Sequence, residues 1–167
     1  MRVLGIDPGS NATGWAVVQR ERGRYVLLGA GVIRTRAEDP IPDRLLRIYE
    51  GLGAVITAQR PEAAAIETIF SHRSADSALK LGQARGVALL ATAQVGLSLA
   101  EYNAMTVKKT VGGHGRAGKP EMVRIVTRLL GLADDLPADA ADAVAIAITH
   151  LGHAVFADKV AGLRGAS

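Results

Sequence analysis

The residues with the clearest chemical potential are acids placed at the ends of apolar segments. Asp7 follows the apolar run 3–6, and Pro8 and Gly9 after it force a turn. Burying a lone carboxylate costs several kcal/mol unless donors or a cation meet it. Asp7 is therefore either a turn cap that accepts hydrogen bonds from its own loop or a ligand for a cation.

Three further acids stand in comparable positions. Glu67 ends a second apolar run, 63–66, and Asp139 and Asp142 open an alanine-rich segment. The two aspartates are three residues apart, so on a helix they share one face. Each acid also has a structural alternative, because aspartates at helix starts are common caps and Glu67 could pair with Arg73.

If the four acids converge, their mutual repulsion calls for cations. Carboxylates about 6 Å apart repel by about 3 kcal/mol per pair at an effective dielectric constant of about 20. Oxygen ligands favour Mg²⁺ or Mn²⁺, and the absence of cysteine with only 4 histidines makes zinc the poorer choice. Two such ions about 4 Å apart can activate a water and stabilise the leaving oxygen of a phosphoryl displacement.

The elements that would position these acids are strands and helices in partial alternation. Hydrophobic patterning predicts strands over residues 3–6, 14–19, 25–35, 63–66 and 97–102. It predicts helices over residues 44–58, 77–95, 104–111, 120–130 and 137–151. Glu21-Arg22-Gly23 would join the second and third strands as a hairpin. The expected fold class is α/β, with a mixed five-stranded sheet flanked by helices.

Two of the predicted helices are rich in small residues. The last one carries six alanines between residues 138 and 148, so it can lie very near a sheet. The helix over 77–95 has small residues that permit close packing against another helix, either in this chain or in a second copy: Ala78, Gly82, Ala84, Gly86, Ala88 and Ala91.

The composition is that of one ordinary domain. With 167 residues, 49% of them apolar, we expect a single domain over residues 1–157 and a flexible tail over 158–167. The lack of cysteine excludes disulfides and thiol catalysis. We expect no signal peptide at the start, because Asp7 follows too few apolar residues, and the most apolar run, 86–100, is too short and too polar to span a bilayer. We therefore expect a cytoplasmic protein without a membrane anchor.

Charge is distributed unevenly along the chain. The net charge is +4, which alone is a weak hint of an anionic partner. The basic segment 108–128 holds six basic residues and one acid, whereas residues 134–142 hold four acids and no base. This pattern suits a polyanion held beside a cation-filled carboxylate pocket, although two solvated helix faces would give it as well.

Five blocks of sequence resemble the RuvC family of Holliday-junction resolvases. They are GIDPGSNATGW at 5–15, AIETIF at 65–70, ADSALKLGQARGVAL at 75–89, VKKTV at 107–111 and DAADAVAIAITH at 139–150. The blocks come in family order and cover nearly the whole chain up to about His150.

The resemblance implies a ribonuclease H-like fold and an endonuclease of DNA recombination and repair. As a homodimer, it would make paired symmetric nicks in strands of like polarity at a four-way DNA junction, leaving 5′-phosphate ends. The implied metal-binding and catalytic acids are Asp7, Glu67, Asp139 and Asp142, with two Mg²⁺ ions that Mn²⁺ can replace. A branch-migration motor complex, RuvA and RuvB, is the implied protein partner.

The resemblance also implies DNA-contacting residues. Phe70 would stack on bases near the crossover, where stacking is worth about 1–3 kcal/mol per base, unless it is an ordinary core residue. Arg73 would meet the DNA backbone, and Lys108 and Lys119 would face the scissile phosphate. Weaker candidates, which could be solvated surface charge, are Arg85, Lys109 and Arg116.

Three other functions remain open from the sequence. A sugar-kinase or actin-like ATPase shares the Asp-x-Gly-Ser opening, but it needs two such lobes around its nucleotide. A ribosomal-RNA-processing nuclease of the same superfold would share the metal acids but lack the 75–89 block. A binding-only junction protein would make no Mg²⁺-dependent nick.

Overall fold

A mixed five-stranded sheet forms the centre of the fold. The computed structural model describes residues 1–68, 74–113, 115 and 118–164, with side chains up to Ala154. The sheet order is β3-β2-β1-β4-β5, and the strands are β1 Arg2–Asp7, β2 Ala12–Glu21, β3 Arg24–Arg34, β4 Ala63–Glu67 and β5 Ser98–Tyr102. The first three strands are antiparallel, whereas β4 and β5 run parallel to β1. The predicted mixed sheet is confirmed.

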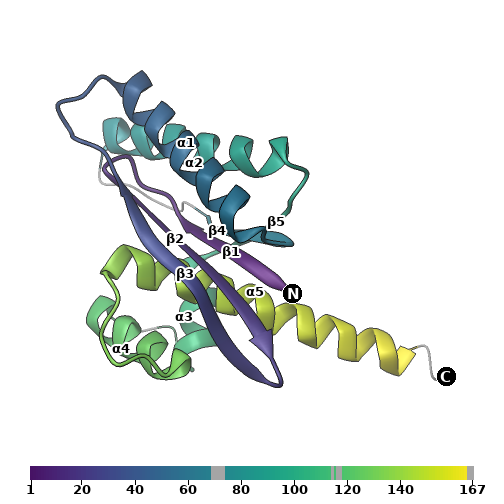
Figure 1. The fold of residues 1–167 in the computed structure, drawn as a ribbon. Coiled ribbons are helices and arrows are strands. Elements are labelled where there is room, and N and C mark those ends of the chain that lie inside the picture. Colours follow the sequence, from purple (N-terminus) through teal and green to yellow (C-terminus); the bar gives the residue numbers. More distant parts are fainter. Residues whose placement is uncertain (69–73, 114, 116–117, 165–167) are drawn as a thin grey trace.

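Helices cover both faces of this sheet (Figure 1). They are α1 Ile41–Gln59, α2 Ala75–Gln94, α3 Ala104–Gly112, α4 Lys119–Leu130 and α5 Ala138–Arg164. α1 and α2 lie on one face, and α3, α4 and α5 lie on the other. Within the described parts of the chain, no helix combines the length and apolar character that a membrane crossing requires.

The central strand β1 is buried from both sides. Its side chains alternate between the faces: Val3 joins the cluster formed with α5, whereas Leu4 and Ile6 join the cluster formed with α1 and α2. All three are 0% exposed. Because the strand is held on both faces and by two neighbouring strands, its backbone has a fixed position up to Asp7.

Local sequence explains where the elements turn and begin. Arg22 and Gly23, with φ of 47° and 85°, form the tight turn of the β2–β3 hairpin, as the sequence predicts. The Asn103 side chain caps α3 by accepting a hydrogen bond from the Thr106 amide at 2.8 Å. α3 follows directly on β5, so its start is tied to the edge of the sheet.

The last helix differs from the sequence-based expectation. It begins at Ala138, with Pro137 as the residue before it, whose carbonyl accepts from the Ala141 amide at 2.9 Å. It continues to Arg164 rather than ending near Leu151. No proline follows Pro137, so none interrupts the helix. The backbone of residues 158–164 is thus helical, and the flexibility of the tail 158–167 stays a prediction.

Candidate active site

Strand pairing brings Asp7 and Glu67 to one edge of the sheet. β1 and β4 are parallel neighbours, with Ile6 opposite Ile66, and each strand ends in its acid. Carboxyl ends of adjacent parallel strands meet at the same edge. The two acids that sequence patterning singled out therefore lie side by side because of the register.

The start of α5 reaches the same place because glycines leave room for it. Gly14 on β2 pairs with Asp7, and a Cβ atom on Gly14 would lie only 1.9 Å from the backbone oxygen of Asp139. On β1, a Cβ on Gly5 would lie 2.0 Å from the backbone oxygen of Ala143. The α5 backbone thus rests directly on the sheet, and Asp139 is held beside Asp7.

Three aspartates form a compact group of oxygens. Asp7, Asp139 and Asp142 each offer a carboxylate oxygen within 4.8 Å of the others, and all three side chains are half-buried. Among the described residues, none donates a hydrogen bond to the Asp7 carboxylate. The turn after it is closed instead by Thr13, whose hydroxyl donates to the Gly9 carbonyl at 2.8 Å. These hydrogen bonds therefore do not support the interpretation of Asp7 as a turn cap.

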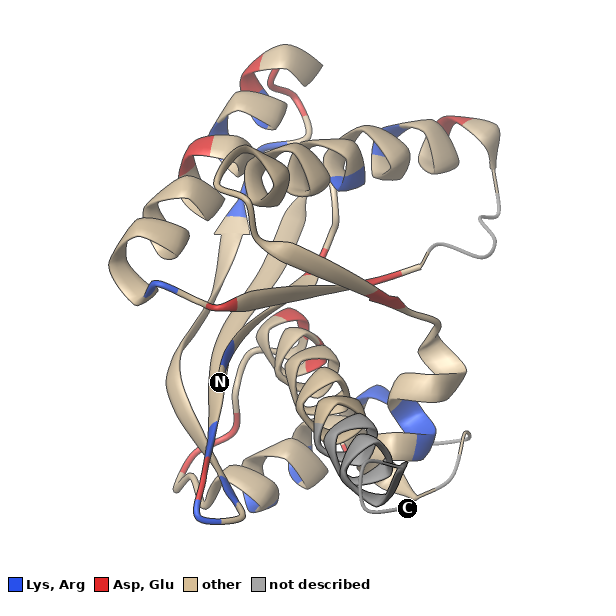
Figure 2. Cartoon of the chain, turned by 90° about the vertical axis from the view of Figure 1, so that its right-hand side faces the viewer, with Lys and Arg blue, Asp and Glu red and all other residues tan. Residues whose placement is uncertain are grey.

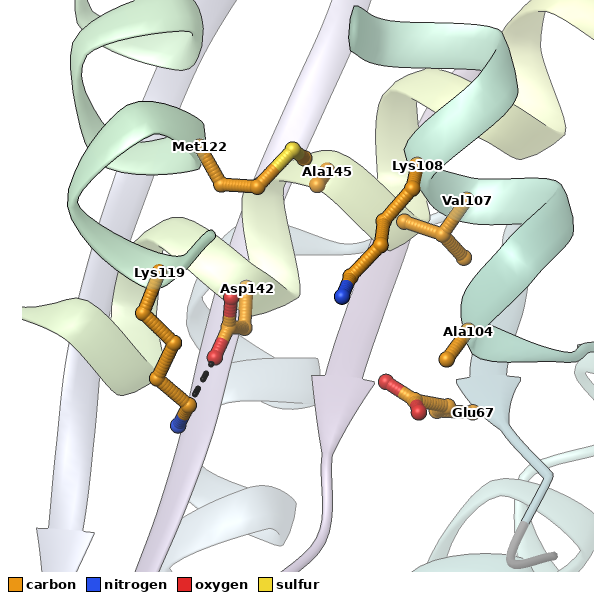
Figure 3. A pocket seen from close by; sticks show the side chains of 8 residues that line it. All are labelled: Glu67, Ala104, Val107, Lys108, Lys119, Met122, Asp142 and Ala145. Atoms are coloured by element: carbon orange, nitrogen blue, oxygen red, sulfur yellow. Dashed lines mark ion pairs between the residues drawn. The ribbon is translucent and has the colours of Figure 1, made fainter. Parts of the chain in front are cut away.

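Glu67 stands outside this tight group but shares a pocket with Asp142. The pocket has a volume of about 190 Å³, and its lining residues are Glu67, Ala104, Val107, Lys108, Lys119, Met122, Asp142 and Ala145 (Figure 3). Glu67 and Lys108 point into it from one side, and Asp142 and Lys119 from the other. Acids and bases therefore face each other across one cavity that could admit a phosphate.

Lys119 forms an ion pair with one of the aspartates. It is the first residue of α4, and its Nζ lies 3.3 Å from an Asp142 carboxylate oxygen. Asp142 in turn raises the pKa of Lys119 above its ordinary value. Lys119 is 70% exposed, whereas Asp142 is 23% exposed, so the lysine reaches from the surface into the site.

Burial and like charge make the acids reluctant to ionise. Burial, followed by the charges of Asp142 and Glu67, raises the pKa of Asp7 from 3.8 to about 7, against the opposing influence of Lys119. Burial and then Asp142 also raise the pKa of Glu67, and Lys108 and Lys119 act in the other direction. Perturbed carboxylates gathered in a cleft are typical of functional sites.

The donor set fits a hard divalent cation. All the candidate ligands are carboxylate oxygens, the group is partly open to solvent, and it carries more negative charge than Lys119 alone offsets. Mg²⁺ and Mn²⁺ prefer such oxygen ligands and keep several waters. In Figure 2, the acidic start of α5 lies on the same side of the sheet as basic segments of the α3–α4 region.

The remaining predicted residues separate into three groups. Phe70, Arg73 and Arg116 lie outside the described residues. Arg85 forms an ion pair with Glu101, which favours a structural role for this weaker candidate. Lys109 is exposed in the last turn of α3.

Sequence reasoning missed Gly5 and Gly14, which let α5 approach. Glycines inside strand patterns were the available signal, because they mark close backbone approach.

Comparisons with known proteins agree with this geometry. Residues 3–150 match the family model described as crossover junction endodeoxyribonuclease RuvC. The RuvC protein of Rhodopseudomonas palustris (strain BisA53) is 48% identical over 160 residues, covering 96% of this chain and 92% of that protein. That of Haemophilus influenzae (strain PittGG) is 53% identical over 149 residues, covering 89% and 77% respectively.

A solved structure extends the agreement to the fold. Thermus thermophilus RuvC in complex with Holliday junction substrate is 38% identical and superposes with a TM-score of 0.87, covering 92% of this chain and 94% of that one. The expected ribonuclease H-like fold class is thereby confirmed. The chain belongs to the RuvC family of crossover junction endodeoxyribonucleases.

Proposed function

We propose that this protein resolves four-way DNA junctions by metal-dependent hydrolysis, making paired symmetric nicks in strands of like polarity. The observation that carries the proposal is the group of three aspartates from β1 and α5, which each offer a carboxylate oxygen within 4.8 Å of the others. Lys119 pairs with one of them, and Lys108 lines the adjoining pocket. Family membership supplies the substrate class, because the T. thermophilus relative was solved with a Holliday junction.

Each side chain has a role that its position supports. Asp7, Asp139 and Asp142 would hold one Mg²⁺, and Glu67 together with Asp7 would hold a second. Bound ions would supply an activated water and neutralise the leaving 3′ oxygen, which yields 5′-phosphate ends. Lys119 and Lys108, on opposite sides of the pocket, would pair with the oxygens of the scissile phosphate.

The basic segment 108–128 and residues 70–73 would make the wider DNA contact. Lys108 and Lys119 would lie against the cleaved strand. Phe70 would stack on a base near the crossover, and Arg73 would meet the backbone. Neutralised phosphates make binding salt-dependent, so junction affinity is expected to fall with added salt, by a slope of about −0.9 per phosphate contacted.

A homodimer would supply the second active site. One face of α2 carries two leucines, Leu79 and Leu90, that are 63% and 60% exposed. Between them lie Gly82 and Gly86, where a Cβ atom would meet nothing within 4 Å. An exposed apolar face with glycines at its centre suits close packing against the same helix of a second copy.

The family resemblance also suggests the cellular setting. We propose that the dimer works in the cytoplasm with the branch-migration complex of RuvA and RuvB, which would deliver a mobile junction to it. Co-purification of the three proteins on a synthetic junction would test this association.

One cleavage assay tests the central proposal. A labelled mobile junction, incubated with Mg²⁺, should be nicked symmetrically, whereas the same junction in EDTA and a linear duplex of equal composition should stay intact. The Asp7→Asn variant should bind the junction in EDTA as the wild type does and lose cleavage. Cleavage by the purified variant, or preferential cleavage of RNA by the wild type, would contradict the proposal.

A further inference from the structure

Arg44 is a buried cation whose partners are all neutral. It lies in the first turn of α1 and is only 4% exposed. Within the described part of the chain it contacts no carboxylate, and its donors go to a hydroxyl, a carbonyl and an amide oxygen. Asp39, Asp43 and Glu50 line the same pocket, but none of them forms an ion pair with Arg44. A buried charge without a direct ion pair is costly, so its placement calls for an explanation.

Two of the three described partners of Arg44 belong to the turn that follows Asp7. Its Nη2 donates to the Ser10 carbonyl at 2.7 Å and to the Asn11 Oδ1 at 2.5 Å. Its Nε donates to the Thr35 hydroxyl at 3.3 Å. The planar guanidinium thus holds two successive residues of the turn with one nitrogen and the residue that follows β3 with another.

Thr35 completes the same network. Its hydroxyl donates to the Ser10 carbonyl at 2.6 Å, and its amide donates to the Asn11 carbonyl at 3.0 Å. On the inner side, the fully buried Thr13 closes the turn through Gly9. The segment between Asp7 and β2 is therefore fixed from both sides.

We propose that Arg44 is a positioning residue, which holds the turn after Asp7 so that the Asp7 carboxylate is ready to share a cation with Asp139 and Asp142. This rests on the proposed metal site. If the turn were ordered only part of the time, the site would bind the ion only during that time. The apparent dissociation constant for the metal then rises in inverse proportion to the ordered fraction.

The test compares Arg44→Met, which removes the charge and the donors, with Arg44→Lys, which keeps the charge and a single donor nitrogen. Mn²⁺ binding is measured by titration calorimetry without DNA. Hydrogen exchange of the Thr35 amide, which is bonded to Asn11, reports the order of the turn. We expect Arg44→Met to weaken Mn²⁺ binding about tenfold, as for a turn ordered about a tenth of the time, and to speed this exchange, with Arg44→Lys in between.

Two control variants separate positioning from general stability. Arg47→Met removes an exposed arginine one turn further along α1, and Ile48→Val trims a fully buried side chain of the same helix. Both should leave Mn²⁺ affinity unchanged, although Ile48→Val lowers the melting temperature. Wild-type Mn²⁺ affinity in a folded Arg44→Met protein would overturn the proposal.

A second variant tests the proposal if Arg44→Met fails to fold. Thr35→Val keeps the shape and removes the hydroxyl that joins Arg44 to Ser10. It should weaken Mn²⁺ binding about threefold, for a turn ordered about a third of the time, and an unchanged affinity would overturn the proposal. The calorimetry requires no cleavage, so a wild type that binds Mn²⁺ but leaves junctions intact would refute the proposed function and not the role of Arg44.

Discussion

At the scale of single residues, Asp7 shows how a site is built at a cost to the fold. Burial and then the charges of Asp142 and Glu67, with which it would hold a cation, raise the pKa of Asp7 and so oppose its ionisation. A turn cap would have shown the reverse, because hydrogen bonds from backbone amides lower the pKa of a carboxylate. The raised pKa of Asp7 therefore fits ligation better than capping.

The first prediction concerns pH. Because the pKa of Asp7 rises from 3.8 to about 7 on folding, the folded state binds the extra proton between these values. The associated stability is fully present below the lower value and is lost as the pH rises through about 7. Thermal unfolding in EDTA between about pH 5.5 and 8 should show a melting temperature that falls with pH.

Asp7→Asn is the control for this titration, because asparagine carries no charge to bury. Its melting temperature should depend less on pH over the same range, although Glu67 still contributes in the same direction. Adding Mg²⁺ to the wild type should raise the melting temperature most at the alkaline end, where the carboxylate is free to bind it. A wild-type melting temperature that rises with pH would contradict the raised pKa of Asp7.

The second prediction concerns Lys119, which lies 3.3 Å from Asp142. Lys119→Met should reduce junction cleavage about a hundredfold, in line with the loss of one charge-stabilising donor. It should also tighten Mn²⁺ binding, because the ammonium no longer competes for Asp142. Single-turnover cleavage and calorimetry measure the two effects separately.

Slower cleavage together with tighter Mn²⁺ binding would distinguish the loss of a phosphate contact from general damage to the site. Lys80→Met, which removes a lysine paired with Asp76 on α2, should change neither quantity. A Lys119→Met protein that cleaves slowly and also binds Mn²⁺ more weakly would indicate a disturbed site rather than a lost phosphate contact.

At the scale of elements, the contact of α5 with the sheet decides the geometry of the site. Alanines on α5 and glycines on the strands bring the two backbones within contact, as at Gly14 and Asp139. Larger residues would separate the helix from the sheet. Asp139 would then no longer reach the edge where β1 ends.

The third prediction follows from this contact. A Cβ atom on Gly14 would lie 1.9 Å from the Asp139 backbone oxygen, so Gly14→Ala must push the start of α5 away. We expect a stability loss of about 1–3 kcal/mol, typical of overpacking, together with weaker Mn²⁺ binding and slower cleavage. Denaturant unfolding and calorimetry test both.

The matched control is Gly53→Ala on α1, where a Cβ atom would meet nothing within 4 Å. It should stabilise the protein by about 0.4–1 kcal/mol, because alanine is the better helix former and restricts the unfolded chain. Its metal affinity should equal that of the wild type. If Gly14→Ala behaved like this control, the close approach of α5 would have no role in assembling the site.

Much of this arrangement could be predicted from the sequence, and the reasons for success and failure are physical. The strands and the acids at their ends could be predicted, because an apolar run such as the one that contains Leu4 and Ile6 stops at a turn signal. The length of α5 could not be predicted, because a helix end without proline depends on tertiary contacts. The pairing of Lys119 with Asp142 could not be predicted either, because it depends on how α4 and α5 pack.

At the scale of the whole molecule, paired nicking requires two sites. Within the described residues, this chain brings together one group of acids that could hold a metal, Asp7, Asp139 and Asp142. The exposed α2 face lies across the sheet from α3, α4 and α5 (Figure 1). A dimer formed through that face would leave both catalytic pockets free for DNA.

The fourth prediction tests this assembly. Leu90 is 60% exposed on the α2 face, and Leu90→Glu would place a charge in the contact of the proposed dimer. We expect sedimentation to change from dimer to monomer, with Mn²⁺ binding unchanged because the proposed metal ligands lie on other elements. Leu129→Glu on α4, 42% exposed, should remain dimeric.

On a plasmid carrying an extruded four-way junction, the monomer should give singly nicked circles, because paired incision needs two active sites on one junction. The wild type should give linear product. Linear product from a Leu90→Glu protein that sediments as a monomer would show that paired nicking does not depend on the α2 contact.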